Sequence, residues 1–353
     1  MCVDVDAIPG CVPEPVDSTG RSAESDERQQ FVSNTQVGPV GVLSRVRSWL
    51  PTTVDRRVRI IAWASFACQV LLIGTGGAVR LTGSGLGCPT WPRCTPESFV
   101  STPEMGIHGV IEFGNRLLTF VLTIVVILAF LAVIRMRAVR RDLFILTLIQ
   151  GLGIPFQAAL GGVTVLTGLN PYIVGAHFVV SIFLVALTTV LLWRVFKGPR
   201  GAYAATSSGY ARLVHVAAAV VGVTVIVGIL TTGSGPHAGD AATPRNGLDP
   251  AVMDHVHSWP AYATLALTIA IVVWTIRAGL PRRFPVLLLG VELVQIAVGI
   301  TQARTGLPPV LVGSHMVLSA LLVAAMTAVV LSLKNDQAPD EIDAPIERDV
   351  ARI

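Results

Sequence analysis

Long apolar segments alternate with short polar ones over most of this 353-residue chain. Eight of the apolar segments are long enough to cross a membrane, because a helical span takes about 20 residues at about 1.5 Å each. The pattern predicts these spans at roughly 60–80, 108–134, 143–166, 171–195, 210–231, 257–278, 284–304 and 309–333. We therefore expect an all-α integral membrane protein with eight transmembrane helices.

Composition and charge agree with this class. Hydrophobic residues make up 52% of the chain and charged residues only 14%, whereas charged residues are about a quarter of a typical soluble domain. Alternate loops carry most of the Lys and Arg, and the positive-inside rule then predicts that both termini are cytoplasmic. The short arginine-rich loops fit a bacterial cytoplasmic membrane, in which lipid would surround the helices. The net charge of +4 follows from these loops and does not indicate nucleic-acid binding.

The two ends of the chain have a different composition. Residues 1–55 are rich in Ser, Asp, Glu, Gln and Pro, which predicts a disordered cytoplasmic tail. No apolar region opens the chain, so we expect no cleavable signal peptide and targeting by the first span. Residues 335–353 are predicted to form a second, short cytoplasmic tail.

The membrane part contains an internal repeat. Residues 168–181 recur as 306–319 at an offset of 138, with Pro, Gly, His and Ser in register. Thr-Gly-Ser-Gly also ends both the first and the fifth span. These matches predict two pseudo-symmetric four-helix halves, 56–200 and 201–334. Each half has an even number of spans, so the halves are parallel repeats about an axis along the membrane normal.

The repeat places a histidine inside a membrane helix in each half, His177 and His315. An ionisable residue in that position indicates a functional site. The C-terminal half has a second histidine, His257, at the same depth, and two histidines on facing helices suit axial ligation of a haem iron. In the N-terminal half Asn115 takes the place of His257, which favours a ligand other than a permanently coordinated haem.

Three further residues lie beside Asn115 on the second span. Glu112 shares its helix face and is a candidate for moving a proton or stabilising a cation, or else an ordinary hydrogen-bonded acid near a helix end. His108, one turn earlier, either serves as an alternative ligand or lies at the interface. Arg116 is a candidate partner for a haem propionate, since guanidinium pairs well with carboxylate.

Two cysteines share the first external loop, Cys88 and Cys94. That side of the membrane is oxidising, so a close pair there can form a disulfide. The sequence leaves open whether the pair is a structural link for a Pro-rich loop or is redox-active.

The loop motif Thr82-Gly-Ser-Gly-Leu-Gly-Cys88-Pro-x-Trp91-Pro-x-Cys94, the segment Ile111–Arg116 and the two Pro-to-His repeats together resemble the haem A synthase family. The resemblance covers about 60–333. It implies an oxidoreductase that converts the C8 methyl of haem O to the formyl group of haem A for cytochrome oxidase.

The same resemblance implies residue roles. His257 and His315 would ligate a resident haem b, His177 would hold the substrate haem, and Glu112 would be catalytic. Cys88 and Cys94 match a loop pair that is disulfide-forming in many members. Haem O, haem A, haem O synthase and the assembly of cytochrome oxidase are the implied substrate, product and partners.

One position departs from the family. Many members have Glu-x-x-His-Arg where this chain has Glu112-Phe-Gly-Asn115-Arg116. The iron of the substrate haem would then be five-coordinate on His177, which we favour, or use His108 or water as its second ligand.

Two other functions fit parts of the pattern. A diheme b-type electron-transfer protein without chemistry of its own would need two permanently ligated haems, and the single histidine of the N-terminal half argues against it. A transporter built on parallel repeats would carry its polar groups near the midplane, whereas here they gather toward the outer leaflet.

Overall fold

The computed structural model describes residues 50–199, 207–237, 239–240 and 242–334, and all regular secondary structure in these ranges is helical. The elements are α2 (Arg56–Leu81), η1 (Pro103–Met105), α3 (Gly106–Ile134), α4 (Arg141–Leu166), α5 (Pro171–Lys197), α6 (Ser208–Ser234), α7 (Pro250–Arg277), α8 (Arg283–Arg304) and α9 (Pro309–Leu331). All eight α-helices are long and apolar enough to cross a membrane, which confirms the predicted fold class. The tails predicted at 1–55 and 335–353 lie outside the described residues, apart from residues 50–55.

Capping residues explain where the helices begin. Helix α7 starts at Pro250, earlier than the expected 257, because Asp249 accepts a hydrogen bond from the Val252 amide at 3.0 Å and Pro250 takes the first helical position. Proline is favoured there since it has no amide hydrogen to satisfy. Asn170 and Pro171 start α5 in the same way. The expected start of α5 at 171 is confirmed, whereas the pattern misses the first turns of α7 because Asp254 and His255 interrupt its apolar run.

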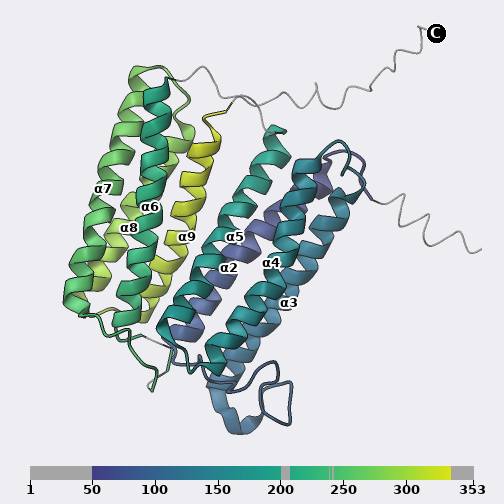
Figure 1. Ribbon diagram of the computed structural model, residues 1–353, viewed down its shortest axis with the longest axis vertical. Helices are drawn as coiled ribbons and strands as arrows, with labels where there is room; N and C mark the ends of the chain where they lie inside the picture. Colours follow the sequence, from purple (N-terminus) through teal and green to yellow (C-terminus); the bar gives the residue numbers. More distant parts are fainter. Residues whose placement is uncertain (1–49, 200–206, 238, 241, 335–353) are drawn as a thin grey trace, which may run out of the picture. The chain divides into compact units, whose positions relative to one another are not determined.

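The same four helix pairings occur in each half. In the N-terminal half α2 packs on α3 and α5, and α4 packs on α3 and α5; in the C-terminal half α6 packs on α7 and α9, and α8 packs on α7 and α9. Figure 1 shows α6, α7 and α8 grouped beside α9, and α3 and α4 beyond α2 and α5. The halves meet through α2, α5, α6 and α9. This arrangement fits the duplicated four-helix unit that the repeat predicts.

The turn between the third and fourth helix of each half has an unusual backbone in both copies. Leu169 has φ 60° and Leu307 has φ 59°, and the glycine before each also has positive φ. A non-glycine residue in the left-handed region is uncommon. Its recurrence at the 138-residue offset shows that the repeat in sequence is also a repeat in local structure.

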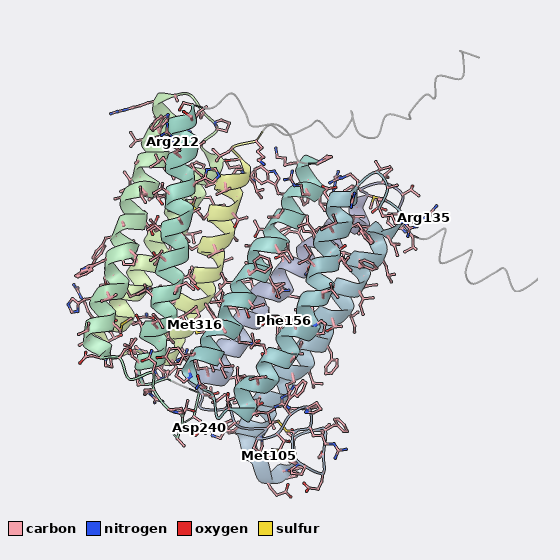
Figure 2. The ribbon with its side chains drawn as sticks, viewed as in Figure 1. Met105, Arg135, Phe156, Arg212, Asp240 and Met316 are labelled. Atoms are coloured by element: carbon pink, nitrogen blue, oxygen red, sulfur yellow. A yellow bond between two sulfur atoms is a disulfide. The ribbon has the colours of Figure 1, made fainter. Side chains whose placement is uncertain are left out.

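The helices alternate in direction, so the loops collect at two ends. We call the end with the loops 82–102 and 235–249 the disulfide end, and the other the arginine end. Figure 2 shows Met105 and Asp240 at the first and Arg135 and Arg212 at the second. The basic residues that suggested a cytoplasmic side lie at the arginine end, and the sidedness itself stays a prediction.

Small residues bring the two halves close together. A methyl group added at Gly74 or Gly77 of α2 would lie 3.2 Å from the side chain of Val317 or Met316, respectively, on α9. Glycine at such positions lets membrane helices approach and gain van der Waals contact. Gly76, next to Gly77, faces away, and a methyl group there meets no atom within 4 Å.

We predict that Gly77→Val destabilises the bundle more than Gly76→Val does. The two substitutions share one helix and one change in helix propensity, so their difference measures the contact with α9. Overpacking a fitted contact costs about 1–3 kcal/mol, and Gly77→Val should show the lower melting temperature in detergent. Equal melting temperatures for the two variants would contradict this view of the interface.

Candidate functional site

His177 on α5 and His315 on α9 lie against the preceding helix in the same way. A methyl group at Gly161 of α4 would be 3.3 Å from Cε1 of His177, and one at Gly299 of α8 would be 3.0 Å from Cε1 of His315. Each imidazole therefore packs directly on the backbone of the preceding helix, at a glycine. The repeat preserves both the histidine and the glycine that makes room for it.

A buried amide fixes the height of each of these histidines. Gln157 Nε2 donates to the His177 carbonyl at 3.2 Å, and Gln295 Nε2 donates to the His315 carbonyl, also at 3.2 Å. Gln157 and Gln295 lie one turn before the two glycines on the same helix faces. In a membrane interior such polar contacts have few competing partners, so each pair holds the histidine helix in register with its neighbour.

In the C-terminal half the structure brings two histidines together. The ring centroids of His257 on α7 and His315 on α9 are 6.3 Å apart, with an angle of 78° between the ring planes. His257 also lies against a glycine, because a methyl group at Gly228 of α6 would be 2.9 Å from its Cε1. His255, the competing histidine in sequence, is exposed and contacts the Ala251 carbonyl instead.

All three histidines keep a ring nitrogen available. Among the described residues, Nδ1 of His177, His257 and His315 is buried without a hydrogen-bond partner. Buried polar atoms are normally satisfied, and an exception calls for an explanation such as a ligand. These Nδ1 atoms lie 3.3–3.8 Å from the methyl position on the glycine beneath each ring, so Nε2 is the nitrogen that each ring can offer to a metal centre.

The N-terminal half has no imidazole at the position equivalent to His257. Asn115 of α3 stands there, and its Oδ1 accepts a hydrogen bond of 2.8 Å from the Thr75 hydroxyl of α2. This hydrogen bond holds the Asn115 side chain against α2 of the same half. His177 is thus the histidine of this half that corresponds to a member of the facing pair.

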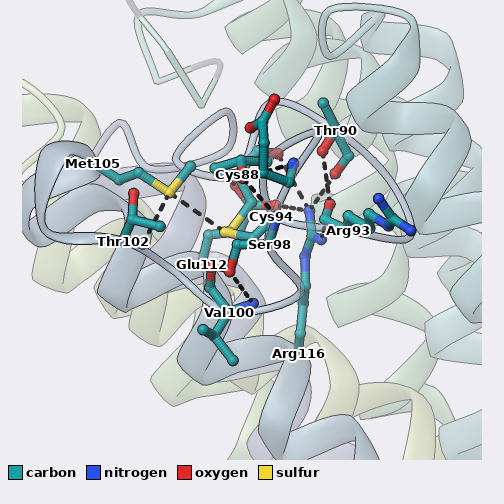
Figure 3. The surroundings of a disulfide bond; sticks show 12 residues. Cys88, Thr90, Arg93, Cys94, Ser98, Val100, Thr102, Met105, Glu112 and Arg116 are labelled. Carbon is teal, nitrogen blue, oxygen red and sulfur yellow. Dashed lines mark hydrogen bonds and ion pairs between the residues drawn. A yellow bond between two sulfur atoms is a disulfide. The ribbon is translucent and has the colours of Figure 1, made fainter.

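Glu112 lies one turn before Asn115 on α3, and only 6% of it is exposed. Its Oε2 accepts a hydrogen bond of 2.6 Å from the Cys88 amide, and its Oε1 forms an ion pair of 2.5 Å with Arg116 Nη2. Figure 3 shows Arg116 and Glu112 both directed from α3 at the loop around the disulfide. The carboxylate is therefore held as a hydrogen-bond acceptor at a fixed place.

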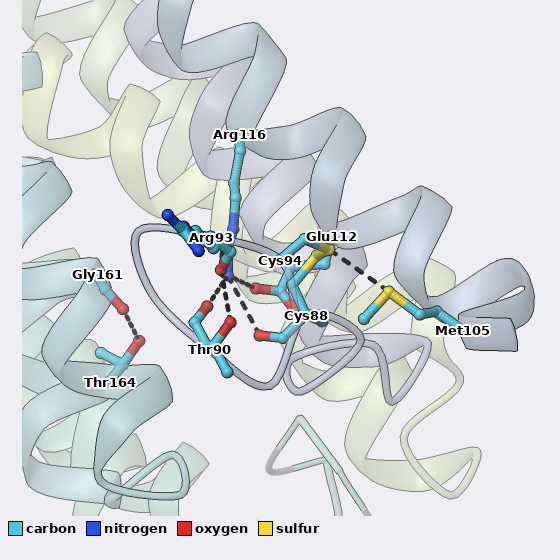
Figure 4. Close-up of polar contacts among 9 residues, drawn as sticks. All are labelled: Cys88, Thr90, Arg93, Cys94, Met105, Glu112, Arg116, Gly161 and Thr164. Atoms are coloured by element: carbon cyan, nitrogen blue, oxygen red, sulfur yellow. Dashed lines mark hydrogen bonds and ion pairs between the residues drawn. A yellow bond between two sulfur atoms is a disulfide. The ribbon is translucent and has the colours of Figure 1, made fainter. Parts of the chain in front are cut away.

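Arg116 is mainly occupied with the same loop. Its guanidinium donates to the carbonyls of Cys88, Thr90 and Arg93 at 3.2–3.3 Å, and Figure 4 shows these contacts converging on one side chain. A guanidinium offers five donors, which explains how one residue holds both the loop carbonyls and Glu112. In this arrangement its donors point into the loop.

The disulfide between Cys88 and Cys94 is formed, and both cysteines are fully buried. On the side opposite Glu112, the indole of Trp91 lies against Gly162 of α4, where it would overlap an added methyl group. The loop is thus attached to α3 by Glu112 and Arg116 and to α4 by Trp91. Since Gly162 follows the glycine beneath His177, the loop reaches the level of that histidine.

His108 occupies a different environment. It is exposed at the start of α3, and its Nδ1 lies 2.9 Å from the Ser84 hydroxyl. Together with Met105 and Asp240 it lines an open cavity of about 560 Å³ at the disulfide end. Sequence reasoning found His108 but neither this cavity nor the glycines beneath the three histidines. For the glycines the repeat held a signal, since Gly161 and Gly299 are in register.

Comparison with known proteins identifies the family. A model of the COX15-CtaA family, described as cytochrome oxidase assembly protein, matches residues 59–327. The chain belongs to this family. The match runs from the first turn of α2 to the last turn but one of α9, so His177, His257, His315, Glu112 and the disulfide loop all lie within it.

Individual relatives have names that are more specific. The protein named heme A synthase from Bacillus pumilus is 36% identical over 138 residues, which are 38% of this chain and 44% of the relative. The heme A synthase from Listeria welshimeri is 34% identical over 135 residues, which are also 38% of this chain and 44% of the relative. The one from Lysinibacillus sphaericus is 33% identical over 148 residues, which are 40% of this chain and 47% of the relative. The chain spans less than half the length of these curated relatives.

The docking of the loop gives a testable prediction. A methyl group at Gly87 would overlap the backbone carbonyl of His108, so Gly87→Ala should separate the loop from α3 and expose the disulfide. A change of about 1.4 kcal/mol in local opening is tenfold in the open population. We expect a water-soluble phosphine to reduce Cys88–Cys94 about tenfold faster than in the parent protein.

Gly114→Ala is the matched control, since a methyl group there meets no atom within 4 Å. Its reduction rate should equal that of the parent protein. Unchanged reduction in Gly87→Ala would mean that the loop does not depend on this close approach.

Proposed function

We propose that this protein is a haem A synthase, which oxidises the C8 methyl of haem O to a formyl group and supplies haem A for cytochrome oxidase. The observation that carries the proposal is the pair of facing histidines in one half and the single corresponding histidine in the other. Membership of a family of cytochrome oxidase assembly proteins and relatives named heme A synthase support it.

The C-terminal half fits a haem held by two imidazoles. With metal–imidazole bonds of about 2 Å, one ion between two rings places their centroids about 6 Å apart, and His257 and His315 are 6.3 Å apart. Both rings have a buried free nitrogen and rest on glycine. His257 and His315 would hold a haem b in this half, which would supply one-electron transfer.

In the N-terminal half His177 would hold the substrate haem on one side. Asn115, tied to Thr75, is a poor iron ligand, so the opposite side is left without an imidazole. A substrate that must enter and leave is better served by one protein ligand than by two. This asymmetry also argues against the alternative of a diheme b-type electron carrier.

Glu112 would serve as the proton acceptor of the reaction. With water as the source of the oxygen atom, conversion of a methyl to a formyl group replaces two C–H bonds by a C=O bond and releases four protons and four electrons (R–CH3 + H2O → R–CHO + 4 H+ + 4 e−). A carboxylate at a fixed position is suited to accept such protons. The Cys88 amide and Arg116 set its position. The disulfide loop then acts as the support for Glu112, with Cys88–Cys94 in a structural role.

The proposal includes the domain assignment and the sidedness. Residues 56–200 would form the substrate half and 201–334 the haem b half, with both termini cytoplasmic and the disulfide end outside. Haem O would come from haem O synthase in the same membrane.

The first test is the haem content of the protein purified with a haem O supply. We expect acid-acetone extraction and chromatography to yield haem B together with haem O or haem A. His315→Ala should lose the low-spin b-type spectrum, because it removes one of the two proposed iron ligands. Two haem B per chain would favour the diheme carrier. An unchanged spectrum in His315→Ala would show that His315 is not an iron ligand and contradict the assignment.

A second test concerns Glu112. Glu112→Gln should keep the b-type spectrum but lose haem A formation by about 100-fold or more, the usual scale for a general base. Glutamine retains an oxygen that can accept from the Cys88 amide, so the disulfide should remain as resistant to phosphine as before. Glu104→Gln, at an exposed carboxyl near the start of the same span, is the control. Normal haem A yield from Glu112→Gln would remove Glu112 from the mechanism.

A further inference from the structure

The C-terminal half contains a buried carboxyl that the proposed reaction does not use. Glu292 lies near the middle of α8 and is 2% exposed. The corresponding residue of the N-terminal half is Ile154, also buried, so the acid is not part of the repeated scaffold. An ionisable residue inside a membrane bundle is costly and indicates a function by default.

Glu292 is surrounded by polar atoms whose hydrogen bonds are unmet. In the part of the chain that the structure describes, both its carboxyl oxygens, Thr268 Oγ1 and Gln295 Oε1 are buried without a partner. Thr268 on α7 is the neighbouring hydroxyl that can donate to the carboxyl, and Gln295 lies one turn away on α8. Buried polar groups that stay unpaired are costly. A cluster of them is suited to a group that gains and loses a proton.

Polar side chains connect this cluster to the two histidines. Gln295 Nε2 is 3.2 Å from His315 Nε2. On α7, Thr268 follows Thr264 by one turn, and the Thr264 hydroxyl is 3.2 Å from that of Thr224 on α6. The Thr224 backbone in turn faces the ring of His257. Glu292 thus belongs to the same polar interior as the proposed iron ligands, and its carboxyl forms no hydrogen bond with either of them.

The cluster has no counter-charge among the described residues. Helix α8 packs on α7 and α9, and the ionisable groups that these helices and α6 turn inward are His257, His315 and Tyr210. The remaining ones on the four helices are exposed: Arg212, His215, Asp254, His255, Tyr262, Arg277, Arg283 and Arg304. An ionised Glu292 would therefore have no ion-pair partner among the side chains, and only the positive charge of an oxidised haem b in this half would offset its charge.

An electron that arrives in the C-terminal half changes how tightly the Glu292 carboxyl holds a proton. It adds a negative charge to an apolar interior, where like charges repel far more strongly than in water. A nearby carboxyl then holds a proton more tightly, because protonation removes one of the two charges. The proton affinity of the carboxyl and the electron affinity of the half are thereby linked.

We propose that Glu292 is the proton-binding site of the C-terminal half, which takes up one proton for each electron that this half receives. This inference rests on the proposed function. The electron comes from oxidation of the substrate methyl group in the other half and leaves to a one-electron acceptor. On its arrival a carboxylate oxygen of Glu292 forms an O–H bond with a proton from water, and on its departure that bond breaks.

The test uses the full-length protein with its haem b bound, in detergent. Redox-difference infrared spectroscopy at an electrode should show the C=O stretch of a protonated carboxylic acid appearing on reduction, with a shift in D₂O. Glu292→Gln should lose this band, Glu292→Asp should retain a shifted one, and Asp254→Asn, at an exposed carboxyl of the same half, should leave it unchanged.

The midpoint potential gives an independent readout. The midpoint potential should fall with rising pH in the parent protein, and it should fall less steeply in Glu292→Gln. Because haem propionates affect both proteins alike, the quantity measured is the difference between the two slopes of midpoint potential against pH. A parent protein that shows no carboxylic-acid band on reduction would overturn the inference, as would equal slopes in the parent protein and Glu292→Gln. Loss of the proposed function is distinguishable, because the purified protein would then lack the b-type spectrum itself.

Discussion

A polar group buried in a membrane bundle must find its partner within the protein, because lipid offers none. The bundle meets this constraint in most places with local contacts. Gln157 and Gln295 bind histidine carbonyls, and Glu112 binds a loop amide and an arginine. The described groups that stay unpaired include a ring nitrogen of each intramembrane histidine and the carboxyl of Glu292. These exceptions lie where the proposed chemistry needs a ligand atom or a mobile proton.

The candidate catalytic carboxylate and the disulfide loop form one structure. Glu112 and Arg116 hold the loop from α3, Trp91 holds it from α4, and Gly87 lets its backbone lie directly on α3. The position of Glu112 therefore depends on the loop and on two helices, with contacts that run from Gly87 to Gly162 in sequence. A disulfide in this place limits the loop without taking part in the hydrogen bonds that hold the carboxylate.

The two halves share one helical framework around the histidine and differ at a few positions. Both copies keep the left-handed Gly-Leu turn, the glutamine and the glycine beneath the histidine. They differ at the residue opposite, Asn115 or His257, and on the third helix, where Ile154 corresponds to Glu292. One scaffold thus presents two facing histidines in one half, and a single histidine together with Asn115 in the other.

The sequence by itself determined the eight helices, the two halves, and the histidines and acid that we propose for the site. Spans, repeats and isolated polar residues are properties of local composition and spacing. In an apolar environment the backbone must form its hydrogen bonds within the segment, so a long apolar segment becomes a helix whatever its neighbours are. Tertiary structure alone decided which atoms meet. The 6.3 Å between His257 and His315, the use of Arg116 in the loop and the isolation of Glu292 depend on how helices rotate and approach. Those rotations follow from side-chain packing across helices, and that packing cannot be read from the periodicity of any single helix.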